Sequence, residues 1–243
     1  MTVKVLRDID GGWLHPSFME LQDYLGPAFK PNWCEPGEEK ARDDRAAFKG
    51  TDEEWTAETH IFAYQNIALA VMGIHRPYIA KLLEQSGDRW GLSVLDYGAG
   101  GGQVGIGLHY LGYKVSFADI PSASLMWLMW RLRKLRLDLP VYAIHPDIEI
   151  PHHDAVLCFD VLEHLPETTR ESILIRLGEI GSIVLVNLVR DEEGTEGVHH
   201  ALDFEAVTAF VRSRYPMCAE DFYPGKDGKP RQRLLIYGNV KIA

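Results

Sequence analysis

The stretch that decides the fold is residues 94–107, Val-Leu-Asp-Tyr-Gly-Ala-Gly-Gly-Gly-Gln-Val-Gly-Ile-Gly. Val94 and Leu95 end an apolar run, and a glycine-rich turn follows Asp96. A helical pattern begins near Gln103. A strand, a glycine turn and a helix in this order are how α/β proteins bring backbone N–H groups against a bound cofactor. The stretch therefore predicts an α/β fold with a cofactor site at this turn.

The glycines of this turn fit two cofactor patterns. The dinucleotide pattern G-x-G-x-x-G is met by Gly100, Gly102 and Gly105, so an NAD site stays open at this point. Read from Gly98, the same pattern fails because a glutamine stands at its third glycine position. The tighter pattern D-x-G-x-G-x-G is met by Asp96, Gly98, Gly100 and Gly102. This second pattern resembles the first motif of class I S-adenosylmethionine (SAM) methyltransferases.

The composition limits the size and class of the protein. A chain of 243 residues, 46% of them hydrophobic, can bury one large α/β core with an appendage. The net charge of −10 argues against a general nucleic-acid binder, which needs a basic surface. The three cysteines, Cys34, Cys158 and Cys218, show neither metal-ligand spacing nor a disulfide framework. We find no signal peptide and no apolar stretch of membrane-spanning length, and we expect a cytoplasmic protein without membrane contact.

Strands and helices alternate after residue 90, which is typical of a parallel sheet. The expected strands are 92–96, 114–118, 141–144, 155–159 and 183–187, and the expected helices are 103–111, 122–137, 166–179 and 203–213. Residues 217–223 and 233–240 flank the stretch Gly-Lys-Asp-Gly at 225–228, which predicts an antiparallel hairpin. The sequence thus predicts a Rossmann-like sandwich, a mostly parallel seven-stranded sheet that ends in a C-terminal antiparallel hairpin.

The first part of the chain is less regular. Residues 1–57 predict an irregular and helical extension, and residues 58–243 a SAM-binding domain whose first helices cover 58–86 and divide at Pro77. The extension is expected to cover the substrate as a lid, to pack as a structural appendage, or to contact a second copy in a homodimer. Tyr64 and Gln65, on the first regular helix, are candidates for contact with the substrate.

Three further segments extend the resemblance to residues 90–240. Asp119 ends the second strand, where a carboxylate can accept both hydroxyls of a ribose, although NAD enzymes use the same acid. Residues 154–166, Asp-Ala-Val-Leu-Cys-Phe-Asp-Val-Leu-Glu-His-Leu-Pro, are very similar to the fourth-strand signature D-x-V-x-x-x-x-V-L-E-H-L of small-molecule class I methyltransferases. Dehydrogenases do not usually carry Glu-His there. Residues 146–149, Pro-Asp-Ile-Glu, resemble the adenine-contact loop of the family.

The resemblance implies a contact for each part of SAM. The glycine turn would let the backbone approach the methionine portion, and Asp96 would organise the turn and the amino group. Asp119 would hold the ribose, residues 147–148 would contact the adenine edge, and the backbone after the fourth strand would line the methionine end. The full set that the resemblance implies is Asp96, Gly98, Gly100, Gly102, Asp119, Ile120, Asp147, Ile148, Phe159 and Asp160. S-adenosylhomocysteine (SAH) would be the product.

Three histidines are candidate catalytic or substrate-binding residues. His164 follows the fourth strand, near where the methyl group is expected to point, and histidine suits proton removal near neutral pH. It could equally cap the next helix or pack in the fold. His199 and His200 follow the fifth strand, a common substrate-binding position in this fold, and could equally be exposed loop residues. Asp160 and Asn187 end neighbouring strands, as magnesium ligands do in metal-dependent O-methyltransferases. The rest of a ligand set is not evident, so no metal is expected.

These features predict a SAM-dependent methyltransferase that moves a methyl group to oxygen, nitrogen or carbon of a small molecule by in-line displacement. A nucleic-acid acceptor is disfavoured, because residues 159–162 are Phe-Asp-Val-Leu rather than an Asn-Pro-Pro-Tyr-like tetrapeptide, and a Pro-Cys nucleophile pair is absent. Three alternatives stay open: an NAD-linked oxidoreductase, a non-catalytic SAM-binding subunit, and other SAM chemistry on the same fold.

Overall fold

The computed structural model describes residues 6–7, 13–14, 16–30, 47–51, 54, 60–86, 91–189, 201–224 and 230–238. The chain divides into two compact units. The first comprises Met1–Ile74, Gly100–Gln103 and Pro121–Leu139, and the second comprises His75–Ala99, Val104–Ile120 and Pro140–Ala243. The expected boundary after residue 57 stays a prediction.

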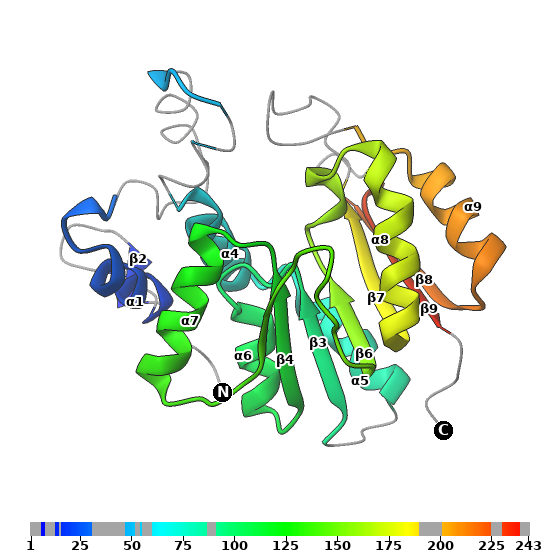
Figure 1. Ribbon diagram of the computed structural model, residues 1–243, viewed down its shortest axis with the longest axis horizontal. Helices are drawn as coiled ribbons and strands as arrows, with labels where there is room; N and C mark the ends of the chain where they lie inside the picture. The colour runs from blue at the N-terminus through cyan, green and yellow to red at the C-terminus, as the bar shows by residue number, and fades with distance from the viewer. Residues whose placement is uncertain are drawn as a thin grey trace. The chain divides into compact units, whose positions relative to one another are not determined.

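A seven-stranded sheet forms the centre of the second unit (Figure 1). Its strands are β3 (Ser93–Tyr97), β4 (Lys114–Asp119), β5 (Val141–Ala143), β6 (His153–Cys158), β7 (Gly181–Val189), β8 (Met217–Pro224) and β9 (Pro230–Gly238). They lie in the order β5-β4-β3-β6-β7-β9-β8; the first five pair in parallel, and β9 is antiparallel to β7 and β8. This confirms the expected Rossmann-like sheet. The strand order changes direction between β3 and β6, and ligands of open α/β sheets bind at such a switch point.

Helices cover both faces of this sheet. The second unit contains α5 (Arg76–Ser86), nearly all of α6 (Gln103–Tyr110), the short 3₁₀ helix η3 (Leu162–His164), α8 (Glu167–Ile180) and α9 (Phe204–Arg214). Figure 1 shows α8 and α9 in front of the sheet and α5 and α6 behind it. The connection from β5 to β6, residues 144–152, contains no helix. Parallel strands are usually joined through a helix, so this loop leaves α8 without a helical neighbour from that crossover.

The core of the second unit explains why its strands are so apolar. Residues 183–188 of β7 are all buried, and they form an unbroken run that is apolar up to Asn187. A parallel strand covered on both faces has no solvent side, so its sequence does not alternate. Leu177 of α8 and Val211 of α9 belong to the same buried cluster. Each such large apolar side chain contributes about 1.5–3 kcal/mol on full burial.

The first unit has a core of its own. Its elements are β1 (Leu6–Arg7), β2 (Trp13–Leu14), α1 (Pro16–Leu25), the 3₁₀ helix η1 (Gly26–Ala28), α4 (Ile61–Met72) and α7 (Ala123–Leu135). Phe18 of α1, Ile67 of α4 and Trp127 of α7 are buried together. Ser122 caps α7, because its side chain accepts a hydrogen bond from the N–H of Leu125.

The segment 58–86 forms two helices as expected, but they divide at residues 73–75 and not at Pro77. The helix α4 ends at Met72, and Gly73 follows it in a left-handed conformation with φ of 73°. Pro77 lies in the first turn of α5, where proline is tolerated because the N–H group has no helical partner there. Within the described residues, no helix combines the length and the apolar character needed to cross a bilayer.

Candidate functional site

The turn after β3 adopts a conformation that requires glycine. Gly98, Gly100 and Gly102 have φ values of 74°, 53° and 72°. The N–H of Gly98 donates to the carbonyl oxygen of Ala118 at 2.8 Å, which ties the start of the turn to the end of β4. A Cβ atom on Gly98 would lie 2.2 Å from Cγ2 of Val161. Both conformation and space therefore exclude a side chain at position 98.

Asp96 organises this turn from inside β3. Its Oδ2 accepts a hydrogen bond from the N–H of Gly105, in α6, at 2.9 Å. Burial raises the pKa of Asp96 to about 6, although the Gly105 hydrogen bond and the charge of His75 act to lower it. Gly105 also met the dinucleotide pattern. A Cβ atom there would lie 2.3 Å from Cε1 of Phe117, so packing of α6 on the sheet is sufficient to require this glycine.

Asp119 lies at the carboxyl end of β4, beside the switch point. The pairing of β3 with β4 ends at Tyr97 and Ala118, so Asp119 stands one position beyond the last β4 residue that pairs with β3. Its Oδ1 accepts the N–H of Ile120 at 2.7 Å. The side chain of Ile120, directly after this acid, is 60% exposed. The strand end thus presents a carboxylate and an uncovered apolar side chain next to each other.

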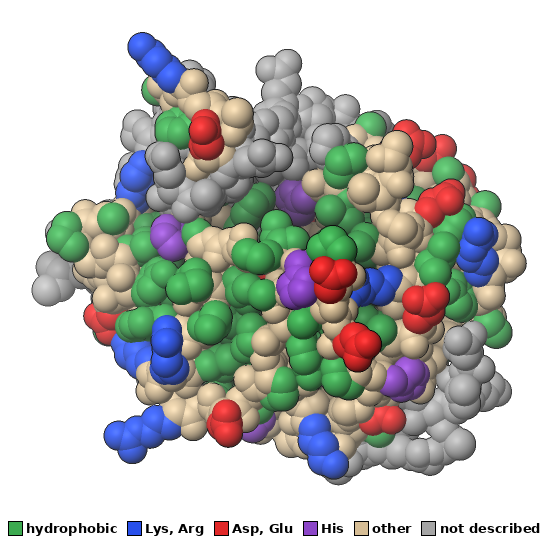
Figure 2. Space-filling view, viewed as in Figure 1, with side chains coloured by type: hydrophobic (Ala, Val, Ile, Leu, Met, Phe, Trp, Pro, Cys, Tyr) green, Lys and Arg blue, Asp and Glu red, His purple; other side chains and the backbone are tan. Residues whose placement is uncertain are grey.

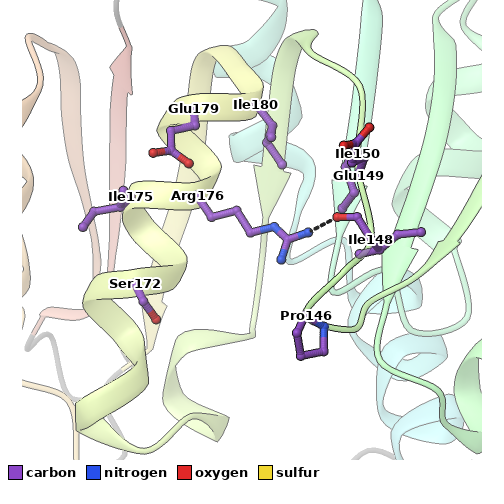
Figure 3. Close-up of a pocket in the computed structure, with 9 residues that line it drawn as sticks. All are labelled: Pro146, Ile148, Glu149, Ile150, Ser172, Ile175, Arg176, Glu179 and Ile180. Carbon is purple, nitrogen blue, oxygen red and sulfur yellow. Dashed lines mark hydrogen bonds between the residues drawn. The ribbon is translucent and has the colours of Figure 1, made fainter.

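The expected adenine loop is held from α8. Asp147 is exposed, and its N–H lies 3.3 Å from Nδ1 of His145. Ile148 is half-buried, and its carbonyl oxygen accepts a hydrogen bond from Nη2 of Arg176 at 2.9 Å. Figure 3 shows the Arg176 side chain reaching from α8 to this carbonyl. An open groove of about 500 Å³ lies between the loop and α8, with Ile148 and Arg176 among the residues that line it.

A polar cluster lies at the carboxyl ends of β6 and β7. Asp160 follows β6 with a left-handed φ of 54°, which is uncommon for a residue other than glycine. Its N–H donates to Oδ1 of Asn187 at 2.6 Å, and Nδ2 of Asn187 donates to Oδ1 of Asp160 at 2.6 Å. The other carboxylate oxygen, Oδ2, lies 2.7 Å from Nε2 of His75. The His75 ring stacks on Phe159, with centroids 5.6 Å apart and an interplanar angle of 18°.

The charges of this cluster differ from those of free side chains. Burial alone would raise the pKa of Asp160, but the hydrogen bond and charge of His75, the Asn187 hydrogen bond and the charge of His164 bring the pKa below its ordinary value. Burial and the neighbouring Asp160 raise the pKa of Glu163 well above its ordinary value. Of the two acids, the surroundings therefore favour the ionised form of Asp160 and the protonated form of Glu163.

The segment that carries Glu163 and His164 is fixed by a buried arginine. Nε of Arg170 donates to the carbonyl oxygens of Leu162 and Leu165 at 3.1 and 3.0 Å. Its Nη1 donates to the carbonyl oxygen of Ala201 at 2.9 Å. His164 is half-buried at the end of η3, and its charge acts on Asp160. The guanidinium thus joins η3 to the chain that leads into α9.

The remaining expected substrate residues are placed differently. Tyr64 is 2% exposed within the first unit, where its hydroxyl accepts the N–H of Lys30 at 2.8 Å and its ring stacks on Phe29 at 5.7 Å. These contacts bury Tyr64 in the core of the first unit, and its contact with the substrate stays a prediction. The side chain of Gln65, as well as His199 and His200, lie outside the described residues.

Sequence reasoning missed His75. The residue directly precedes α5 in the stretch Gly-Ile-His-Arg-Pro, and nothing local connects it with Asp160, 85 positions later. The one available signal was Pro77, which marks a helix start and thus places His75 just before a helix. The Asp160–Asn187 neighbourhood was foreseen from their strand ends, but not their mutual hydrogen bonds.

Comparisons with solved structures find the same architecture. Magnesium protoporphyrin IX methyltransferase from Synechocystis PCC 6803, solved with bound SAM, is 16% identical, covers 91% of this chain and 96% of its own, and gives a TM-score of 0.57. A SAM-dependent methyltransferase from Clostridium acetobutylicum ATCC 824 is 9% identical over 66% of this chain and 89% of its own, with a TM-score of 0.54. A candidate RNA methyltransferase from Pyrococcus horikoshii is 16% identical over 67% of this chain and 82% of its own, with a TM-score of 0.51.

No protein-family model matches the sequence, and no curated protein matches it. The likeness therefore rests on the arrangement of strands and helices. The sheet order with its antiparallel pair and the length of the structural match agree with the architecture expected from the sequence motifs. The chain has the Rossmann-like fold of class I SAM-dependent methyltransferases.

Proposed function

We propose that this protein is a SAM-dependent methyltransferase with a small-molecule acceptor. The observation that carries the proposal is the carboxylate of Asp119 at the carboxyl end of β4, next to a turn whose glycine at position 98 leaves no room for a side chain. Both lie beside the point between β3 and β6 where the strand order changes direction. That point is where open α/β sheets bind nucleotide-like ligands.

The residues present fit SAM. A ribose needs an acceptor for its two hydroxyls, and Asp119 offers an acidic side chain at the strand end. An adenine ring needs an apolar surface, and the 60% exposed side chain of Ile120 stands directly after that acid. Asp147 is exposed in the loop expected to meet the adenine edge. Asp96, fixed on Gly105, would hold the turn that faces the methionine portion.

The chemistry asked of the protein is mainly orientation. When bound, SAM supplies a methyl group already activated by the positive charge on its sulfur. The chain would align the acceptor with that methyl group and exclude water, and alignment of two reactants can contribute about 7–11 kcal/mol. Asp160, which is ionised in a buried cluster, would face the positive charge from the end of β6.

The net charge and the sequence after β6 favour a small-molecule acceptor over a nucleic acid. The net charge of −10 opposes binding to a polyanion, because phosphate contacts need clustered lysine and arginine. The segment after β6 also lacks the tetrapeptide expected of many nucleic-acid methyltransferases. Because one similar structure is a candidate RNA methyltransferase, the two acceptor classes must be compared directly.

Ligand binding separates the methyltransferase from the oxidoreductase. In calorimetric titrations of the purified protein, we expect SAM and SAH to bind at one site and NADH to give no saturable heat. Binding of NADH alone to a folded protein would contradict the proposal. Transfer of isotope-labelled methyl groups from SAM into a small-molecule extract, with total RNA offered in a parallel reaction, then identifies the acceptor class. Label that enters only the RNA would contradict the small-molecule assignment.

A further inference from the structure

One ring nitrogen of His75 contacts Asp160, and the other has no hydrogen-bond partner among the described residues. Nε2 lies 2.7 Å from Oδ2 of Asp160, while Nδ1 is buried and, within the described part of the chain, has no hydrogen-bond partner. The ring cannot turn freely, because it stacks on Phe159 and lies 6.0 Å from the Tyr78 ring. Since Asp160 is itself fixed by two hydrogen bonds to Asn187, the position of His75 is set by the ends of β6 and β7.

Burial favours the uncharged form of several acids around this pair. It raises the pKa of Glu163, Cys158 and Tyr78 above their ordinary values. Charges within the cluster also come from Asp96 on β3, His164 on η3 and Arg170 on α8. When His75 is neutral, the buried Asp160 carboxylate loses the positive charge that pairs with its Oδ2.

We propose that His75, held by Asp160 and Asn187, takes up the proton that replaces the positive charge of SAM when SAM is converted to SAH. This inference rests on the proposed function. A buried carboxylate is stabilised by one positive charge beside it. In the SAM complex the sulfur supplies that charge, and His75 is neutral. In the SAH complex the sulfur is neutral, and protonated His75 supplies it.

The transfer then balances in atoms and charge. The acceptor atom forms its bond to the methyl carbon, and the carbon–sulfur bond breaks with its electron pair staying on sulfur. The acceptor's proton moves to Nδ1 of His75, the nitrogen left without a partner in the free protein. Asp160 and Asn187 are positioning residues in this scheme. The acceptor class that fits is a neutral O–H or N–H group that must lose its proton on methylation.

The prediction can be measured without knowing the acceptor. SAM and SAH share their adenosine, amino and carboxylate groups, so the ratio of their affinities isolates the charge on sulfur. We expect this ratio to change with pH between about 5 and 8, where histidine changes its charge. As the pH falls, the affinity for SAH relative to that for SAM should rise by up to about tenfold per pH unit, because one proton is bound when SAH replaces SAM. Calorimetry at each pH gives both affinities.

Four variants, one of them a control, assign the pH dependence to its residue. His75→Gln keeps a polar side chain and should remove the pH-dependent part of the ratio that belongs to His75. Asp160→Asn should shift the remaining dependence to lower pH and weaken SAM more than SAH. His152→Gln is the matched control, because His152 is exposed next to the start of β6, at the opposite end of that strand, and it should behave like the wild type. Asp96→Asn removes the contribution of the other buried acid whose pKa lies in this range.

The outcomes separate the two claims. A ratio that does not change with pH, or that changes equally in wild type and His75→Gln, overturns the role of His75 while SAM binding stands. Failure of both SAM and SAH to bind overturns the proposed function, and this inference with it. If His75→Gln does not fold, nitrogen-15 spectra of the wild-type ring decide: His75 should be neutral with SAM bound and protonated with SAH bound at the same pH. Equal protonation in both complexes contradicts the inference.

Discussion

Oδ2 of Asp160 lies 2.7 Å from Nε2 of His75, although 85 positions separate the two residues. Asp160 follows β6, and His75 stands directly before α5, ahead of the first strand of the main sheet. The contact therefore brings the segment that enters the second unit to the carboxyl end of a central strand. This is the edge of the sheet where ligands of this fold class bind.

Removal of the Asp119 carboxylate should weaken SAM binding. Asp119→Ala is expected to raise the dissociation constant by about tenfold to a hundredfold, since a hydrogen bond to a charged group contributes about 1.5–3 kcal/mol. Calorimetry with SAM and SAH measures the effect. The exposed acid Asp138, changed to alanine, is the control and should leave both affinities unchanged. Unchanged affinity in Asp119→Ala with an unchanged melting temperature would remove the ribose assignment.

Release of the loop before β6 should also weaken SAM binding. In Arg176→Ala the carbonyl of Ile148 loses its charged donor, and a hydrogen bond of this kind contributes about 1.5–3 kcal/mol. We expect faster amide hydrogen exchange in residues 144–152 and a loss of up to about tenfold in SAM affinity. Glu171→Ala, at an exposed position of the same helix, is the comparison. If the loop exchanges as slowly in Arg176→Ala as in the control, the hydrogen bond does not hold it.

The buried Arg170 should matter for stability. Arg170→Leu removes three hydrogen bonds to carbonyl oxygens, and each buried acceptor left unpaired costs about 1–3 kcal/mol. Denaturant unfolding should show a large loss of stability. The same change at Arg212, whose side chain is 57% exposed in an ion pair with Glu220, should cost about 0–1 kcal/mol. Similar losses for both variants would show that the carbonyl contacts of Arg170 add little.

Asp96 should make the stability of the free protein depend on pH. Burial raises its pKa from 3.8 to about 6 in the folded state, so the folded state binds the proton more tightly than the unfolded state. Its contribution to stability is thus complete below pH 3.8 and is lost as the pH rises through about 6. Asp96→Asn stays neutral and should gain about 3 kcal/mol relative to wild type between acidic and neutral pH.

The measurement for this prediction is urea unfolding of both proteins across that pH range. The difference between the two unfolding free energies isolates Asp96, because all other titrating groups are shared. A difference that stays constant with pH, or that changes in the opposite direction, would show that Asp96 titrates at its ordinary pKa in the folded protein.

The fold could be predicted because its signals are local. The uninterrupted apolar run of residues 183–186, the capping serine Ser122 and the glycine turn at 98–102 are each recognisable within a few residues. Their order along the chain then predicts a parallel sheet, and its topology is restricted because crossovers between parallel strands are right-handed. Element ends moved by one to three residues at most positions, which is the usual effect of packing on helix and strand termini.

The candidate site was predicted only where its residues carry a motif. Asp96, Asp119 and Asp160 were found because each stands at a strand end in a recognisable spacing. His75, Arg170 and Arg176 act through tertiary contacts over 85, 31 and 28 positions, and such contacts leave no local pattern. Tyr64 was chosen for its place on a helix, but burial against Phe29 depends on how that helix packs.

A crystal structure of the protein with SAH bound tests the account most directly. The account predicts that the ribose hydroxyls bind the carboxylate of Asp119, with the adenine against Ile120 and the sulfur at the carboxyl ends of β3 and β6. SAH bound elsewhere, or a ribose that faces a residue other than Asp119, would contradict it.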